Sequence, residues 1–180
     1  MPSRAASTAS VRNLLRRFGR SRRGSAAVEF ALVAPVFFAL LFAIIETAIV
    51  FFAGQALETM TQDSAREILT GQAQTAGYLK ADFQKEVCKK IPALFSCGNV
   101  VVDVQSYTNF ASVTISSPID ASGNCNPPNN YSPGVAGSIV VVRVFYQWPQ
   151  IVTGLGYNIS NCTGQKRLLV AAAAFKNEPY

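Results

Sequence analysis

Histidine is absent from this chain of 180 residues. It is the side chain that most often acts as a general base, and it is also the commonest metal ligand. A membrane-tethered enzyme would therefore need a nucleophile with some other base, or a pair of carboxylates. We expect a protein that is not an enzyme and that binds no cofactor and no metal.

Charged residues are also scarce, at 14% of the chain against about a quarter in typical soluble domains. Hydrophobic residues reach 49%, so the deficit predicts a membrane segment or an extensively buried surface. The charge is unevenly placed, because residues 25–180 carry nine basic and ten acidic residues, a net −1. Residues 1–24 hold no acid and seven arginines: Arg4, Arg12, Arg16, Arg17, Arg20, Arg22 and Arg23.

A basic arm of this kind can bind nucleic acid. Here, however, it runs directly into an apolar segment, and arginines in that position keep the preceding residues on the cytoplasmic side of a membrane. We therefore interpret residues 1–24 as a leader peptide that associates with the membrane and not with nucleic acid.

The apolar segment is long enough to cross a bilayer. Residues 30–45 contain no charge, and after Glu46 apolar residues continue to Ala53. The 29 residues 25–53 would span about 43 Å as a helix, more than the ~30 Å hydrocarbon core. We predict a single-pass protein with residues 25–53 as its transmembrane helix and residues 54–180 exported.

The exported region predicts an α+β domain. The first helix should continue, with an amphipathic pattern, to about Thr70. A second helix should carry Leu79, Phe83 and Val87 and end before Ile91-Pro92. A small antiparallel sheet should follow, from a hairpin of residues 100–104 and 110–115 and from strands at 139–146 and 167–175.

All four cysteines follow the apolar segment: Cys88, Cys97, Cys125 and Cys162. None forms a C-x-x-C pair, which disfavours zinc binding and thioredoxin-type chemistry. An even number on the outer side of a membrane favours two disulfides over four buried thiols. Of the three connectivities, we favour Cys88–Cys97 and Cys125–Cys162, with the second bridge joining the two long loops around the 139–146 strand.

The motif with the most functional information lies where the leader meets the helix. A glycine, Gly24, follows two arginines, and Glu29 lies five residues beyond it, just before the uncharged segment. An ordinary secretory signal is cut after its apolar region, whereas the best processing signal here precedes it. The full segment is Arg-Arg-Gly-Ser-Ala-Ala-Val-Glu-Phe at 22–30.

This motif resembles the class III prepilin signal of type IV pilins, which a membrane-embedded aspartyl prepilin peptidase cuts after the glycine. The resemblance implies cleavage between Gly24 and Ser25. A closer resemblance is to the TadE family of pseudopilins of the tight-adherence (Flp) pilus. It is carried by Gly-Ser-Ala-Ala-Val-Glu-Phe-Ala-Leu-Val-Ala-Pro at 24–35, Ile-Glu at 45–46 and the ending Phe-Lys-Asn-Glu-Pro-Tyr at 175–180.

The resemblance gives Glu29 a role in subunit assembly. Cleavage would create an α-amine on Ser25, and in pilins the glutamate of an entering subunit pairs with the terminal amine of its neighbour. A carboxylate at a membrane boundary is costly unless it is paired, although Glu29 could also simply cap the helix N-terminus. For Glu46 two alternatives remain open: a bond to another subunit, or extension of its side chain towards water.

We therefore expect a minor pseudopilin in a bacterial inner membrane, with a cytoplasmic N-terminus, a periplasmic or extracellular domain and possible incorporation in the pilus. Its partners would be other pilins and pseudopilins, the pilus assembly machinery and the prepilin peptidase. The alternative is an uncleaved single-pass protein whose outer domain binds a partner or scaffolds the machinery. The major Flp pilins are much smaller than this chain, which favours a minor or assembly role.

Overall fold

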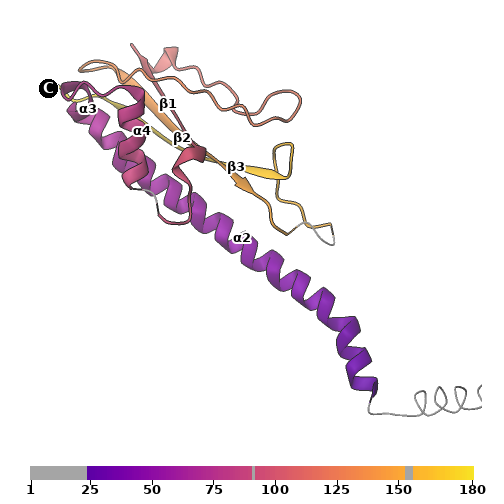
Figure 1. The fold of residues 1–180 in the computed structure, drawn as a ribbon. Coiled ribbons are helices and arrows are strands. Elements are labelled where there is room, and N and C mark those ends of the chain that lie inside the picture. The colour runs from indigo at the N-terminus through magenta and orange to yellow at the C-terminus, as the bar shows by residue number, and fades with distance from the viewer. Residues whose placement is uncertain (1–23, 91, 153–155) are drawn as a thin grey trace, which may run out of the picture. The chain divides into compact units, whose positions relative to one another are not determined.

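The computed structural model describes residues 24–90, 92–152 and 156–180, so most of the leader lies outside the described residues. The chain divides into two compact units, Met1–Ile44 and Ile45–Tyr180. Within these ranges the chain forms one long α-helix, two short ones and three strands, which Figure 1 labels. The fold is α+β, as the sequence predicts.

The long helix, α2, runs without interruption from Ser25 to Leu69 (Figure 1). Up to Ile44 its large apolar side chains are exposed, among them Phe30, Leu32 and Leu40. In water this exposure would be costly, whereas lipid accommodates it. The length and composition of α2 are sufficient to cross a membrane.

The rest of α2 belongs to the core of the second unit. Its buried apolar side chains are spaced three to five residues apart along one face: Ala53, Leu57, Met60, Ala65 and Ile68. This confirms the predicted amphipathic extension to about residue 70. Two helices follow, α3 (Gln72–Thr75) and α4 (Lys80–Lys89), and α4 buries Phe83 and Val87 as expected. Leu79, which was expected on the same helix, instead precedes it as the N-cap residue and is exposed.

Three antiparallel strands form the sheet in the order β1-β2-β3: β1 (Val100–Tyr107), β2 (Ile139–Pro149) and β3 (Lys166–Lys176). Alternate residues of each strand join one core with α2 and α4. The opposite face is buried in part, because Phe145 and Leu168 pack against Cys125, Cys162 and Ile119 from the loops, whereas Val170, Ala172 and Ala174 of β3 are exposed. Helices therefore cover one face of the sheet, and loops cover part of the other.

The predicted hairpin between residues 100–104 and 110–115 is wrong. β1 pairs with β2, and residues 110–112 form a short 3₁₀ helix, η3, which Asn109 caps by accepting the backbone N–H of Ser112 at 2.9 Å. The side chains of Phe110 and Ile115 are exposed. A β-like composition does not make a strand where no neighbouring strand is available, and here the outer edge of β1 is occupied by the loop around Tyr131.

The C-terminal tail closes the domain at the end of α2. The backbone N–H of Glu178 donates to the carbonyl of Leu69 at 2.9 Å, and the Asn177 amide donates to the carbonyls of Pro133 and Val135. Gly71 has a φ of +76°, and a Cβ at this position would lie 2.3 Å from the ring of Tyr180. Glycine is therefore required here both for its backbone conformation and for the close approach of the tail.

A buried ion pair connects the sheet to its covering loop. Asp103 and Arg143 face each other across β1 and β2, and Arg143 donates to the Asp103 carboxylate at 2.8 and 3.2 Å. Asn130 donates to the same carboxylate through its backbone and side chain, while Arg143 donates to the carbonyl of Ser116 at 2.9 Å. The pair thus fixes two points of the loop that links β1 to β2.

The pKa of Asp103 follows from two opposing effects. Burial raises it, but the hydrogen bonds from Arg143 and Asn130 prevail and hold the pKa below the ordinary aspartate value of 3.8. Because the folded state has the lower pKa, this contribution to stability is complete above the ordinary value and is lost as the pH falls through the folded one.

We predict that Asp103→Asn lowers the free energy of unfolding by about 3–5 kcal/mol, because Arg143 is left buried without a counter-charge. Asp120→Asn is the matched control, since Asp120 also accepts several hydrogen bonds but lies in an exposed turn. Urea unfolding of the detergent-solubilised protein, followed by near-UV circular dichroism, measures both. The wild type should also lose stability below about pH 4, more steeply than Asp103→Asn. Equal losses for Asp103→Asn and Asp120→Asn would show that the pair does not stabilise the domain.

Candidate functional site

The predicted processing site lies at the start of α2. Gly24 is the first described residue and has 3₁₀ geometry, and α2 begins at Ser25. Both residues are exposed, and a Cβ added to Gly24 would meet nothing within 4 Å. The space around Gly24 therefore does not explain why a glycine stands there, which is consistent with a residue read by a processing enzyme.

Glu29 lies one helical turn beyond Ser25, on the same face of α2. Its side chain is exposed, and it forms no hydrogen bond or ion pair with any residue that the structure describes. The carboxylate is therefore accessible to a group on another molecule. At four residues, or about 6 Å along the axis, it is also close to the position of an α-amine on Ser25.

Glu46 has the opposite environment, with only 5% of its surface exposed. Its two carboxylate oxygens accept the backbone N–H groups of Ile151 and Val152, at 2.7 and 2.9 Å. One helical position further on, the hydroxyl of Thr47 is hydrogen-bonded to the hydroxyl of Tyr157. Glu46 thus binds the loop that follows β2, so neither alternative considered from the sequence, a bond to another subunit or extension into water, describes it.

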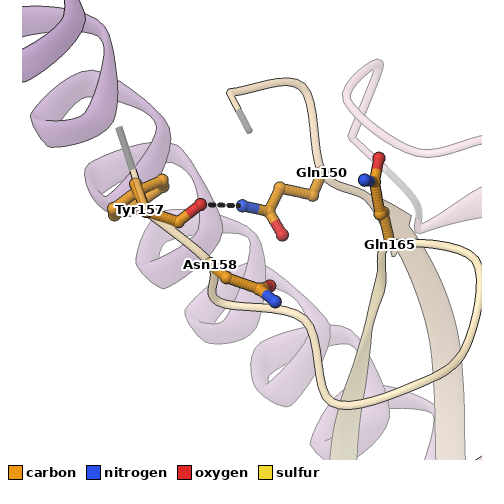
Figure 2. Close-up of a pocket in the computed structure, with 5 residues that line it drawn as sticks. Gln150, Tyr157, Asn158 and Gln165 are labelled. Atoms are coloured by element: carbon orange, nitrogen blue, oxygen red, sulfur yellow. Dashed lines mark hydrogen bonds between the residues drawn. The ribbon is translucent and has the colours of Figure 1, made fainter. Parts of the chain in front are cut away.

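The loop between β2 and β3 is also held from within. The side-chain amide of Gln150 donates to the carbonyl of Val152 at 2.8 Å. It also donates to the carbonyl of Tyr157 at 3.3 Å (Figure 2). The backbone N–H of Gln150 donates to the carbonyl of Gln165 at 2.9 Å. These contacts border a pocket of about 290 Å³, lined by Gln150, Gly156, Tyr157, Asn158 and Gln165.

The structure joins Cys88 to Cys97 and Cys125 to Cys162, the two pairs favoured from the sequence. The first bridge links the end of α4 to the 3₁₀ turn η2 (Cys97–Asn99), which precedes β1. The second joins the β1–β2 loop to the β2–β3 loop on the sheet face that carries Phe145. Across residues 24–90, 92–152 and 156–180, no three His, Cys, Asp or Glu side chains are grouped so as to hold a metal ion.

The binding of Glu46 to its own chain was not predicted from the sequence. One signal was available, because Glu46 is the only charged residue between Glu29 and Glu58 and residues 150–165 contain no charge at all. Its partners, however, are backbone groups 105 and 106 positions away, and any residue except proline can supply them.

The comparison with protein families gives a match over the segment that contains Glu29 and Glu46. Residues 24–66 match the TadE-like protein family. The match begins at Gly24 and includes Glu29, Glu46 and almost all of α2. It confirms the resemblance noted in the sequence and, with the membrane-length helix, supports a membrane protein associated with the Tad pilus.

No curated protein and no solved structure gives a significant match to the chain. The TadE-like assignment therefore rests on the segment around α2, and the α+β domain beyond residue 66 is described by its own structure.

The disulfides give a direct test of this domain. Non-reducing peptide mapping of membrane-extracted protein should recover Cys88 with Cys97 and Cys125 with Cys162. Loop-closure estimates give about 3 kcal/mol of stabilisation for the short bridge and about 4 kcal/mol for the long one. The double variant Cys125→Ala/Cys162→Ala should therefore unfold at lower urea than Cys88→Ala/Cys97→Ala. Free thiols, or Cys88 joined to Cys162, would contradict the connectivity.

Proposed function

We propose that this chain is a minor pseudopilin of a tight-adherence (Flp) type IV pilus. It is cut after Gly24 by a prepilin peptidase and assembled through α2. The observation that carries the proposal is the position of the TadE-like match. It starts at the glycine where the sequence predicts cleavage and continues along the helix that would pack against neighbouring subunits.

The first unit has the surface that such assembly requires. From Ser25 to Ile44 the large apolar side chains of α2 face outward, so lipid can surround the helix before assembly and other subunits can surround it afterwards. Apolar packing alone fixes neither the register nor the direction of approach. An exposed carboxylate at one end of the helix, close to a newly formed amine, supplies the missing specificity.

The pairing would involve two chains. Glu29 of one subunit would accept a hydrogen bond from the α-ammonium group of Ser25 of its neighbour. In a low-dielectric setting this pair is strong when formed, and each charge is costly when alone. The role is structural rather than catalytic, and the partners are other pilins, the assembly machinery and the peptidase. The leader would remain cytoplasmic while the domain beyond α2 is exported.

Processing is tested by the N-terminus of the protein isolated from membranes. Intact-mass analysis should give a chain that begins at Ser25 with both disulfides formed. A chain that begins at Met1 would instead favour the uncleaved single-pass protein with a partner-binding domain. Cleavage near residues 53–56 would indicate an ordinary secretory signal and refute the pseudopilin proposal.

The assembly role is tested at Glu29. Glu29→Ala and Glu29→Gln should both be cleaved, oxidised and membrane-inserted, because the peptidase reads the leader and glycine and the domain lies elsewhere. Both should abolish piliation, since the pair needs a negative charge and not only the shape of the side chain. Asp63→Ala is the matched control, because it removes an exposed carboxylate from α2 outside the apolar segment. Normal pilus counts with Glu29→Ala would refute the pairing of Glu29 with a neighbouring amine. Capping of the helix would not explain Glu29 either, because no acidic residue lies in the first turn of α2.

A further inference from the structure

We propose that Ile151 and Val152, here called the clamped segment, contact the lipid surface, and that Glu46 holds them at the outer edge of the bilayer. The proposed partner is a phospholipid membrane. The inference requires that α2 anchors the chain in that membrane, but it depends neither on cleavage after Gly24 nor on pilus assembly.

The length of α2 puts Glu46 at the membrane boundary. Between the two glutamates the helix has 16 uncharged residues, 30–45, or about 24 Å, which places both carboxylates within a few ångströms of the two faces of a hydrocarbon core of about 30 Å. Glu46 is the next residue and the first charge after that stretch. The membrane-spanning segment would then end near Ile45 and not at Ala53, and whatever Glu46 binds lies at the level where lipid tails give way to headgroups.

Three of the four backbone polar groups of the clamped segment are satisfied from within the chain. Both backbone N–H groups donate to Glu46, and the carbonyl of Val152 accepts the amide of Gln150. Backbone that meets lipid needs such internal partners, because no water is present to replace them. A loop in water has no such requirement, because water can take the place of these partners.

The side chains are arranged in the opposite way to those of a loop in water, with the charged one buried and an apolar one exposed. The charged residue, Glu46, is turned inward, whereas Ile151 is 79% exposed. On α2, Phe51 and Phe52 are 72% and 64% exposed. They lie about 8–9 Å along the helix beyond Glu46, close to the outer limit of an interfacial layer about 5–8 Å thick.

Charge is absent from the whole neighbourhood. Residues 47–57 of α2 and residues 150–165 between β2 and β3 contain no Asp, Glu, Lys or Arg. A segment at the acyl boundary excludes such residues because their transfer is costly. The β1–β2 loop, residues 108–138, is nearly as poor in charge, with Asp120 alone, so this composition is compatible with lipid contact but does not distinguish the clamped segment. Contact with lipid accounts for the exposed isoleucine and the inward carboxylate together.

The contact can be measured with the full chain in vesicles of phosphatidylethanolamine and phosphatidylglycerol. Ile151→Cys would carry an NBD fluorophore, with Ile115→Cys as the matched control, because Ile115 is a loop isoleucine that is also largely exposed, at 66%. The native cysteines are all in disulfides and remain unlabelled under non-reducing conditions. Spin-labelled lipids should quench the label at 151 several-fold more than the label at 115, and iodide in the water should do the reverse.

Glu46→Gln, in the Ile151→Cys background, tests the clamp. Glutamine keeps one acceptor but turns a donor towards the second N–H group, so lipid quenching at 151 should fall and iodide quenching should rise. Glu46→Asp, which keeps both oxygens but shortens their reach, is a second variant. Glu58→Gln is the control on the same helix, because Glu58 accepts only from the neighbouring Gln62 side chain.

Three results would overturn the proposal. Equal lipid quenching at positions 151 and 115 would show that the clamped segment does not contact the membrane. A blue-shifted label at 151 without lipid quenching would show that a protein neighbour covers the segment instead. Unchanged quenching at position 151 in both Glu46 variants would show that Glu46 does not hold the clamped segment at the membrane. Intact-mass analysis reports cleavage separately, so failure here is distinguishable from failure of the pseudopilin proposal.

Discussion

The structure depends on one constraint: a single helix, α2, has to suit two different surroundings. Near its N-terminus the apolar side chains face outward, as they would in lipid, whereas towards its C-terminus a single apolar stripe forms the centre of a protein core. The change happens without a break in the helix, because backbone hydrogen bonding is the same in both settings. Only the side-chain pattern changes, from uniformly apolar to amphipathic, and the domain forms where a stripe becomes available to pack against.

Helices cover only one face of the three-stranded sheet, and loops cover part of the second face around Phe145. The β1–β2 loop has little regular structure of its own, so its position has to come from specific bonds. Asp103 and Arg143 supply them from the middle of the sheet, and the Cys125–Cys162 bridge fixes the loop at a second point. Such a loop is held by a few strong contacts, so the loss of one should affect it more than the loss of one apolar contact affects the core.

The sequence predicted those parts of the fold in which apolar residues recur in a regular pattern. Leu57, Met60 and Ile68 indicated the helical extension, and the uninterrupted β-rich run beginning at Ile139 indicated the central strand. The hairpin failed because Phe110 to Ile115 has a strand-like composition but no partner strand, and strand formation depends on the partner. The contact of Glu46 with its own chain was not predicted, for a related reason. Its partners are backbone N–H groups more than 100 residues away, and these leave no trace in residue identity.

Glu29 and Glu46, the two acids of the apolar segment, differ in the hydrogen-bond partners that their own chain provides. Glu46 is buried, and both of its oxygens are satisfied by backbone N–H groups, so a second chain would have to displace those bonds before binding it. Glu29 is exposed and has no partner among the residues that the structure describes. An unpaired carboxylate at a membrane boundary is the more costly state, and docking of a subunit that brings an ammonium group relieves that cost. The difference between the two environments leaves Glu29 as the acid that a second chain could reach without breaking existing hydrogen bonds, which supports the assembly role proposed for it.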